Sequence, residues 1–319
     1  AVVRMMSAEG SFGSEVTGVF AVEKTAEMIE KIKNLLKSGL SPTALNTLIR
    51  CPLNFYYKYI LGVGELEDPD EEVSASEFGT LVHRALELLY ADMDGKPVTF
   101  AFLAEAKKQV DSAIHTALNE QMAEPRPEGK LLLSLELAKF QVQRLLDLEK
   151  SRITRLGNSG TALIYMGSEQ TLSYETVVDL EQESIPLVFK GKIDRIEKTG
   201  NTIWVIDYKT GAVEAADLSV RSWDQLKNAT KSKALQLAVY GLALNRRYPG
   251  MELKSGIVST ISPQEEPLSL KIEGKEVVYT SAEEAIITEV LTDVIREVLT
   301  MELPFVHDPK SNYCAYCHG

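Results

Sequence analysis

Two aspartates and two lysines in the second half of the chain have the most informative spacing in the sequence. Asp194 lies in a β-type segment that ends at Gly200-Asn201, and Asp207 lies in the β-type segment that follows. A Gly-Asn pair is typical of a two-residue hairpin turn. Such a turn predicts that Asp194 faces Asp207 and that Lys192 faces Lys209. Because side chains alternate along a strand, all four would lie on one face of the sheet.

Opposed aspartates have two interpretations. Their β carbons would lie about 4.5–5.5 Å apart, a separation at which like charges destabilise a strand pair. In the first interpretation the acids lie at a solvated strand end and Lys192 and Lys209 neutralise them. In the second they bind a divalent metal ion, since Mg²⁺ and Mn²⁺ prefer oxygen ligands. Lys209 would then lie beside the metal, where it could orient a water molecule or stabilise charge on a phosphoryl group.

The order of several motifs resembles one known family. The segments GKIDRIE (191–197) and WVIDYKTG (204–211) are similar to the core of the PD-(D/E)XK nuclease superfamily. They most resemble the RecB-type exonuclease domain found at the C-termini of RecB and AddB proteins. Three further segments resemble the other motifs of this domain, in the same order: SPTALNTLIRCPLNFYYKYI (41–60), FGTLVHRALELLY (78–90) and QLAVYGLAL (236–244).

The resemblance implies hydrolysis of phosphodiester bonds with Mg²⁺ or Mn²⁺ as the cofactor. The implied catalytic residues are His83, Asp194, Asp207 and Lys209, and Lys209 would position the attacking water. The implied metal ligands are His83, Asp194, Asp207 and the backbone carbonyl of Tyr208. Gln236, Tyr240 and Lys192 would bind substrate. Without the resemblance, His83 reads as an ordinary helix residue, and Gln236 and Tyr240 read as one flank of a helix.

Three cysteines suggest a second metal centre. Cys314 and Cys317 have the Cys-x-x-Cys spacing of metal ligands, and Cys51 precedes a proline. In AddB-type nucleases such residues hold a [4Fe–4S] cluster, so the resemblance implies Cys51, Cys314 and Cys317 as possible ligands. The chain has no fourth cysteine, and such clusters prefer four thiolates. We therefore expect the cluster in an intact, longer protein, and three thiols without a cluster as the alternative.

The helices and strands expected around these residues indicate an α/β fold. We expect a restriction-endonuclease-like mixed central β-sheet flanked by helices, with a largely helical N-terminal half. Residues 1–40 would form an arm and a helix that link to a larger protein, and residues 41–319 the nuclease domain. Ser41 and Ser76 are predicted helix starts, and Pro52 should bend or split the helix that Ser41 begins. Further helices are expected over 22–38, 99–121, 129–156, 232–247 and 281–301, and strands over 162–180, 185–211, 252–262 and 267–280.

The charge of the chain argues at first against a nucleic-acid partner. Its 319 residues carry 34 basic and 46 acidic side chains, a net charge of −12, whereas phosphate contacts need positive charge. Seven acids lie between residues 60 and 82, where there is no lysine or arginine: Glu65, Glu67, Asp68, Asp70, Glu71, Glu72 and Glu77. By contrast, residues 219–236 carry a net charge of +3 and Trp223, which could stack on a base. We therefore expect weak, metal-dependent and salt-sensitive DNA binding.

The resemblance implies a DNA exonuclease domain, the nuclease part of an AddB-like helicase–nuclease subunit in double-strand-break repair. Its partners would be DNA and a helicase subunit, with no membrane. The chain has no Walker A sequence and so no P-loop motor of its own, and three cysteines without a signal peptide favour the cytoplasm. Two alternatives stay open: a catalytically silent nucleic-acid-binding or scaffold module, and a stand-alone nuclease that acts on other nucleic acids.

Overall fold

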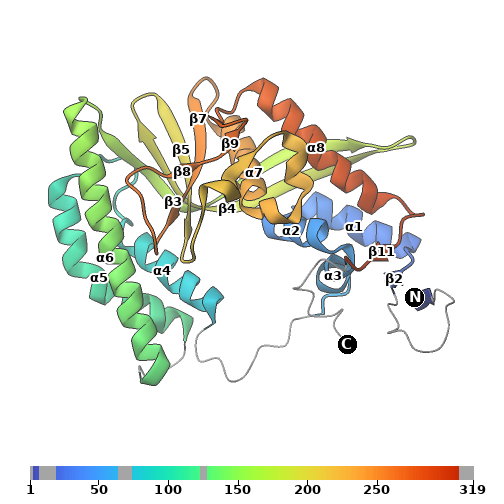
Figure 1. The fold of residues 1–319 in the computed structure, drawn as a ribbon, viewed down its shortest axis with the longest axis horizontal. Helices are drawn as coiled ribbons and strands as arrows, with labels where there is room; N and C mark the ends of the chain where they lie inside the picture. The colour runs from blue at the N-terminus through green and yellow to red at the C-terminus, as the bar shows by residue number, and fades with distance from the viewer. Residues whose placement is uncertain (1–2, 7–18, 64–73, 123–127, 309–319) are drawn as a thin grey trace.

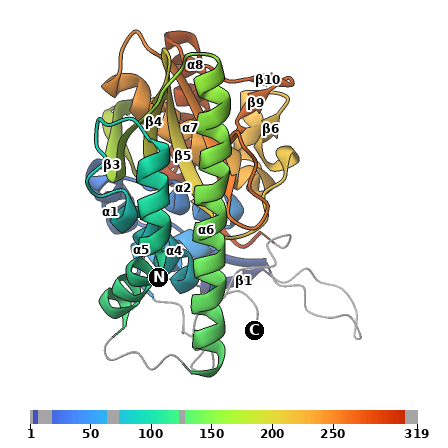
Figure 2. The same cartoon turned by 90° about the vertical axis from the view of Figure 1, so that its left-hand side faces the viewer.

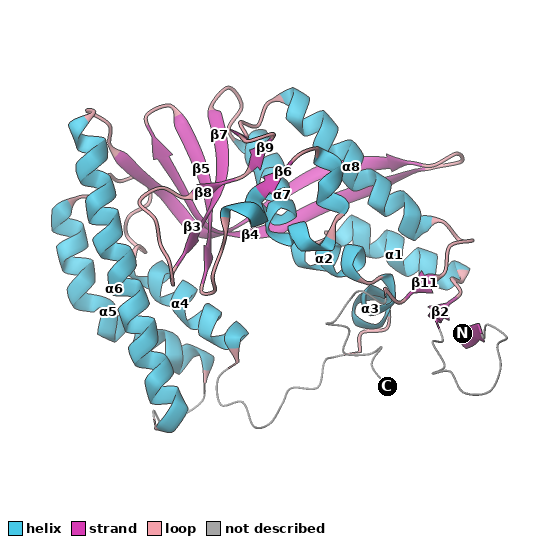
Figure 3. Ribbon diagram, in the orientation of Figure 1, coloured by secondary structure: helices cyan, strands magenta, loops and turns pink. Residues whose placement is uncertain are grey.

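A mixed five-stranded sheet forms the centre of the molecule. The computed structural model describes residues 3–6, 19–63, 74–122 and 128–308. The sheet order is β3 (Leu163–Asp179), β4 (Ser184–Thr199), β5 (Thr202–Lys209), β7 (Glu252–Ser259) and β8 (Leu268–Ser269). Among the strand pairs of this sheet, only β5 and β7 run parallel. Helices flank the sheet on both sides, which confirms the predicted α/β architecture (Figures 1 and 3).

The hairpin of β4 and β5 has the predicted register. Paired positions run from Thr199–Thr202 to Arg195–Ile206, and Gly200 supplies the positive φ that the turn requires. Asp194 and Asp207 lie directly beyond the last paired position. The expected facing of Lys192 and Lys209 was wrong, because the hairpin pairing has ended and Lys192 forms an ion pair with Glu169 of β3.

One group of helices packs on the sheet in the larger core cluster: α1 (Ala26–Ser38), α2 (Pro42–Arg50), α3 (Pro52–Phe55), α7 (Ser232–Arg247) and α8 (Ser281–Leu299). Ser41 caps α2 by accepting the backbone N–H of Ala44, as predicted. Pro52 separates α2 from α3, and a π-helical turn follows over Tyr56–Ile60. Helix α1, which the sequence analysis placed in a linking arm, contributes Ile32 and Leu36 to this core.

The opposite face of the sheet is covered by α4 (Ala75–Leu89), α5 (Phe100–Gln121) and α6 (Gly129–Asn158) (Figure 2). Successive side chains of β5 point alternately into the two core clusters. Ile203 and Val205 belong to the larger cluster, whereas Trp204, Ile206 and Tyr208 belong to the second one. The strand that carries Asp207 is therefore held on both faces.

Helix α4 begins two residues earlier than predicted. Ser74, not Ser76, is the N-cap, because Ser74 and Glu77 form a reciprocal capping box. Ser74 Oγ accepts the N–H of Glu77 at 3.2 Å, and Glu77 accepts the N–H of Ser74 at 2.7 Å. Glu77 is thus part of the first helical turn, where the helix dipole favours an acid. The other six acids of the acidic segment lie outside the described residues.

Short elements complete the described fold. Strands β1 (Val3–Met6), β2 (Val19–Val22) and β11 (Phe305–Val306) form a small sheet that was not predicted, because strands this short leave no alternation to read. A second small sheet contains β6 (Ser219–Val220), β9 (Lys271–Ile272) and β10 (Lys275–Glu276). Three 3₁₀ turns lie between β5 and α7, over Ala215–Leu218, Trp223–Lys227 and Ala229–Lys231. Within the described ranges, no helix has the length and apolar character needed to cross a membrane.

Candidate active site

Asp194 joins three elements at the open end of the hairpin. Its Oδ2 accepts the backbone N–H of Tyr208 in β5 at 2.7 Å, and its Oδ1 lies 3.3 Å from Nδ1 of His83 in α4. The carboxylate therefore accepts the Tyr208 N–H directly beyond the last backbone pair of the hairpin. Only 11% of its side chain is exposed. This contact brings the predicted site residues of α4, β4 and β5 together.

His83 has oxygen acceptors at both ring nitrogens. Its Nε2 lies 3.0 Å from the carbonyl oxygen of Tyr208, and its Nδ1 faces Asp194. Burial by itself lowers the pKa of the imidazole, but the hydrogen bond and charge of Asp194 outweigh it and raise the pKa above its ordinary value. The arrangement favours a proton on each nitrogen. The Asp194 carboxylate and the Tyr208 carbonyl can also bind a hard cation. Protonation of His83 and binding of a metal ion to these groups would therefore compete.

Asp207 is buried and held from two sides. Its Oδ1 accepts a hydrogen bond from Nε2 of Gln236 at 2.9 Å, and its Oδ2 lies 2.8 Å from Nζ of Lys209. Burial, and then the charge of Asp194, raise the pKa of Asp207 to about 6, against the opposing effect of Lys209. The two aspartates are therefore close enough to disfavour simultaneous ionisation without a further positive charge.

Gln236 and Tyr240 lie side by side on α7, as their spacing predicts. Gln236 Nε2 also donates to the Tyr240 hydroxyl at 2.8 Å, and this hydroxyl donates to the carbonyl of Lys192 at 3.0 Å. Gly191 permits this approach, since a β carbon there would lie 2.4 Å from the Tyr240 ring. The pair thus connects α7 to both strands of the hairpin.

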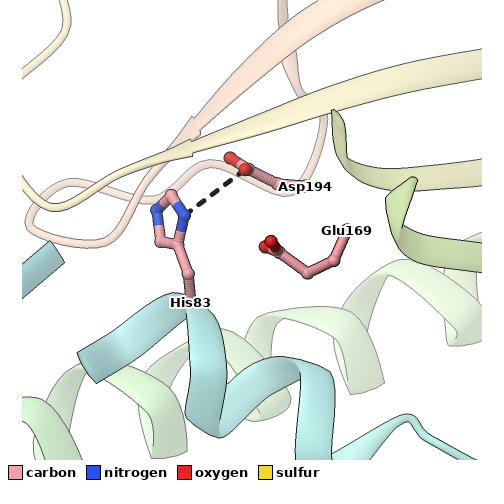
Figure 4. A group of neighbouring side chains, drawn as sticks. All are labelled: His83, Glu169 and Asp194. Atoms are coloured by element: carbon pink, nitrogen blue, oxygen red, sulfur yellow. Dashed lines mark ion pairs between the residues drawn. The ribbon is translucent and has the colours of Figure 1, made fainter. Parts of the chain in front are cut away.

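Glu169 of β3 is a site residue that the sequence analysis missed. Ligand atoms of His83, Glu169 and Asp194 all lie within 4.8 Å of one another, and the three side chains converge in Figure 4. The pairing of β3 with β4 shifts between Tyr165 and Ser168, and Glu169 has a φ of +53°. A bulge re-aims side chains in a way that regular alternation does not predict. The one signal in the sequence is Gly167, two residues earlier.

The donor atoms at this site suit a divalent cation. Carboxylate oxygens, an imidazole nitrogen and the Tyr208 carbonyl form a set that fits Mg²⁺ or Mn²⁺. His83, Glu169 and Asp194 form the closest group, whereas Asp207 lies outside it, held by Gln236 and Lys209. When bound, such an ion would polarise a phosphate and lower the pKa of a bound water.

A surface pocket of about 370 Å³ opens beside His83 and is lined by Glu169, Lys192 and Asp194. Its basic side chains have acidic partners: Lys192 pairs with Glu169, and Arg84 pairs with Glu87 and Glu120. Trp223 is buried, so the expected stacking on a base was wrong. In the loop that carries Trp223, Lys227 and Lys233 pair with Asp293 and Asp217, which reduces the free positive charge expected there.

Among the three cysteines, the structure describes only Cys51. It is buried, its Sγ accepts the N–H of Asn54 at 3.5 Å, and it lies 3.6 Å from Nδ1 of His307. Cys314 and Cys317 lie outside the described residues. The iron–sulfur cluster therefore stays a prediction from the sequence.

The buried Asp207 gives a pH dependence that can be measured. Its pKa is about 6 in the folded chain, against about 3.9 in an unfolded chain. Asp207 therefore holds more protons in the folded than in the unfolded state between pH 4 and 6, and its contribution to the free energy of unfolding of the metal-free protein should fall as pH rises through this window. The loss by pH 7 should be of order 1–3 kcal/mol.

Urea unfolding at pH 4.5 and pH 7 measures this effect, and Asp207→Asn should remove it. Asp217→Asn is the control, because Lys233 lowers the pKa of Asp217 below its ordinary value and its contribution has the opposite sign. Equal pH dependence in the wild type and Asp207→Asn would contradict the expectation.

The sequence of the chain is similar to those of known proteins. The family model described as the PD-(D/E)XK nuclease superfamily matches residues 39–318. An ATP-dependent helicase/deoxyribonuclease subunit of Alkaliphilus metalliredigens is 24% identical over 196 residues, which cover 57% of this chain and 16% of that protein. The protein of the same name from Clostridium tetani is 23% identical over 189 residues, 55% of this chain and 16% of its own. An uncharacterised Rickettsia typhi protein is 27% identical over 184 residues, 57% of this chain and 19% of its own. The chain thus matches less than a fifth of the length of each of these relatives.

Proposed function

Because the chain belongs to the PD-(D/E)XK nuclease superfamily, we propose that it is a metal-dependent deoxyribonuclease of the exonuclease type. The observation that carries this proposal is the convergence of His83, Asp194, Asp207 and Lys209 at one end of the β4–β5 hairpin. An imidazole, two carboxylates and an ammonium group from three elements can hold a metal ion and a phosphate together.

In this proposal each residue acts through the contacts described above. His83, Asp194, Asp207 and the Tyr208 carbonyl would hold the Mg²⁺ or Mn²⁺ ion, with Glu169 as an added carboxylate. Lys209 would orient the attacking water or stabilise charge that develops on the phosphate. Gln236 and Tyr240 would keep Asp207 in place and contact the substrate, with Lys192 at the mouth of the pocket.

The biological setting is also part of the proposal. Two relatives are named as subunits of an ATP-dependent helicase/deoxyribonuclease, which supports DNA as the substrate and a helicase as the partner. We propose that the chain is the nuclease part of such a protein in double-strand-break repair, acting in the cytoplasm. Since most basic side chains around the pocket have acidic partners, binding to DNA alone should be weak and salt-sensitive.

The test is a cleavage assay with end-labelled linear single- and double-stranded DNA, closed circular DNA, and RNA. Mg²⁺, Mn²⁺ and a chelator are compared at several salt concentrations. We expect degradation of linear DNA with Mg²⁺ or Mn²⁺, none with the chelator, and no cutting of closed circles. Cutting of circles would exclude an exonuclease, and preference for RNA would support the stand-alone alternative. Binding without cleavage, also with the partner helicase present, would favour the silent module.

A further inference from the structure

A buried cluster of charged and phenolic side chains lies between the sheet and α6, beneath the candidate site. Arg195 and Glu197 come from β4, Glu149 and Arg152 from α6, and Tyr208 from β5. Arg195 and Glu197 are almost fully buried, with side-chain exposures of 4% and 0%. Burying charges has a large desolvation penalty, and apolar side chains of similar volume often stabilise a fold as well or better. Stabilisation of the fold alone is therefore a weak explanation for this cluster.

Arg195 is the centre of this cluster. Its Nη2 pairs with Glu149, and lies 2.9 Å from Glu197, while its Nη1 donates to the Tyr208 hydroxyl at 3.1 Å. The guanidinium also lies 5.0 Å from the centre of the Tyr90 ring, and the Tyr90 hydroxyl donates to Glu149. Since Tyr90 directly follows the last residue of α4, the cluster joins α4, α6, β4 and β5.

The cluster lies next in sequence to both aspartates of the site. Arg195 follows Asp194, and Tyr208 follows Asp207. The backbone pairing of the hairpin ends at Arg195–Ile206, so the hydrogen bond from Arg195 to Tyr208 links the two strands where the ladder has ended. Tyr208 also contacts the site through its backbone, because its N–H donates to Asp194 and its carbonyl faces His83. Any shift of Tyr208 would therefore move three candidate metal ligands relative to one another.

We propose that Arg195 and the Tyr208 hydroxyl are positioning residues, which set the separation of Asp194 and Asp207 and thereby the affinity of the site for its metal ion. Neither group belongs to the proposed set of metal ligands, and the two bond to each other. The link lies on the face of the sheet that α4 and α6 cover, and Glu149 of α6 fixes the direction of the guanidinium. This inference rests on the proposed metal-dependent nuclease function.

Tyr208→Phe is the sharpest test, because it removes one hydroxyl and leaves the ring and the backbone carbonyl in place. Tyr279→Phe is the matched control: Tyr279 is also buried, and its hydroxyl bonds to Ser255 and to the Leu237 carbonyl in the other core cluster. Both variants lose a buried hydroxyl contact, so both should lower the melting temperature similarly. Only Tyr208→Phe should weaken Mn²⁺ binding, by about 10-fold or more, as loss of a group that orients ligands typically does.

Mn²⁺ binding without DNA is measured by electron paramagnetic resonance, and cleavage is measured separately as kcat and KM. We expect Tyr208→Phe to lower kcat at fixed Mn²⁺ while KM for DNA stays within twofold of the wild type. Arg195→Lys should retain part of the Mn²⁺ affinity that Arg195→Met loses. Combining Arg195→Met with Tyr208→Phe should add little to the larger single effect, because both break one link.

Wild-type Mn²⁺ affinity in Tyr208→Phe and Arg195→Met, with both variants folded, would overturn the inference. Equal loss in Tyr208→Phe and Tyr279→Phe would also overturn it, since the effect would then follow stability alone. A wild type that binds Mn²⁺ but cleaves no substrate would contradict the proposed function, and the binding comparison would still decide the role of Arg195. A wild type that binds no Mn²⁺ would overturn both.

Discussion

Replacing Asp194 with asparagine is expected to abolish cleavage, by about 10³-fold or more, while the protein stays folded. Asp194 is the residue at which α4, β4 and β5 meet, through His83 and the backbone N–H of Tyr208. The amide keeps the shape of the carboxylate and an oxygen that can accept the Tyr208 N–H. It removes the charge that would bind the metal and that raises the pKa of His83.

The same substitution should leave the metal-free protein as stable as the wild type, or more so. The charge of Asp194 raises the pKa of Asp207, which means that the two carboxylates repel each other across the hairpin. Removing one charge relieves this repulsion, so function and stability should move in opposite directions. Thermal unfolding and Mn²⁺ titration of the same samples measure both.

Asp217→Asn is the matched control for Asp194→Asn. Asp217 also accepts a backbone N–H, from Glu214 at 3.1 Å, and it pairs with Lys233. It lies in the 3₁₀ turn after β5 and has no contact with the metal-ligand group among the described residues. Full activity in Asp217→Asn beside inactivity in Asp194→Asn would assign the loss to the site. Retained cleavage in Asp194→Asn would remove Asp194 from the mechanism.

Replacing Lys209 with methionine should lower kcat by about 10²–10⁴-fold and leave the protein able to bind Mn²⁺. Lys209 lies on the strand that carries Asp207, 2.8 Å from its Oδ2, and 31% of its side chain is exposed. It is therefore placed to reach a water or a phosphate from beside the ion. Methionine keeps most of the length of the side chain and removes only the ammonium group.

The loss of the Lys209 charge should also change how Mn²⁺ binding depends on pH. Lys209 lowers the pKa of Asp207, against burial and Asp194, which raise it. Without the ammonium group the carboxyl should hold its proton to a higher pH, so Mn²⁺ binding should require a higher pH than in the wild type. Titrations at pH 6 and pH 8 measure this shift.

Lys254→Met is the control for Lys209→Met. Lys254 lies on the neighbouring strand β7 and forms an ion pair with Glu276 at 3.1 Å. Its removal should leave kcat unchanged. If Lys209→Met cleaved as fast as Lys254→Met, Lys209 would have no part in the chemical step.

Local sequence determined much of the fold around the site. Gly200-Asn201 fixed the register of the hairpin, since a two-residue turn leaves one alignment of the flanking strands. The i, i+4 spacing of Gln236 and Tyr240 placed both on one side of α7, because the helical period requires it. Ser41 and Pro42 marked the start of α2 through their own backbone preferences. Each of these features depends on residues within one turn or hairpin.

Contacts between distant segments were decided only by the tertiary structure. Glu169 joins His83 and Asp194 because a bulge in β3 turns its side chain toward them, and pairing irregularities depend on the partner strand. Lys192 pairs with Glu169 instead of facing Lys209, since the hairpin ladder ends at Arg195. Trp223 lies in the core and not on the surface, because the segment around it packs against α8, although its sequence is basic and polar.

The buried partners of Arg195 show the same division. The sequence shows an arginine directly after Asp194 but not which residues it contacts. The structure places it against Glu149, which lies 46 residues earlier on α6, and against the hydroxyl of Tyr208. Local spacing therefore determined which residues are presented together on one strand or helix. Packing of α4 and α6 on the sheet decided which charges meet, because those contacts depend on how distant apolar faces are buried.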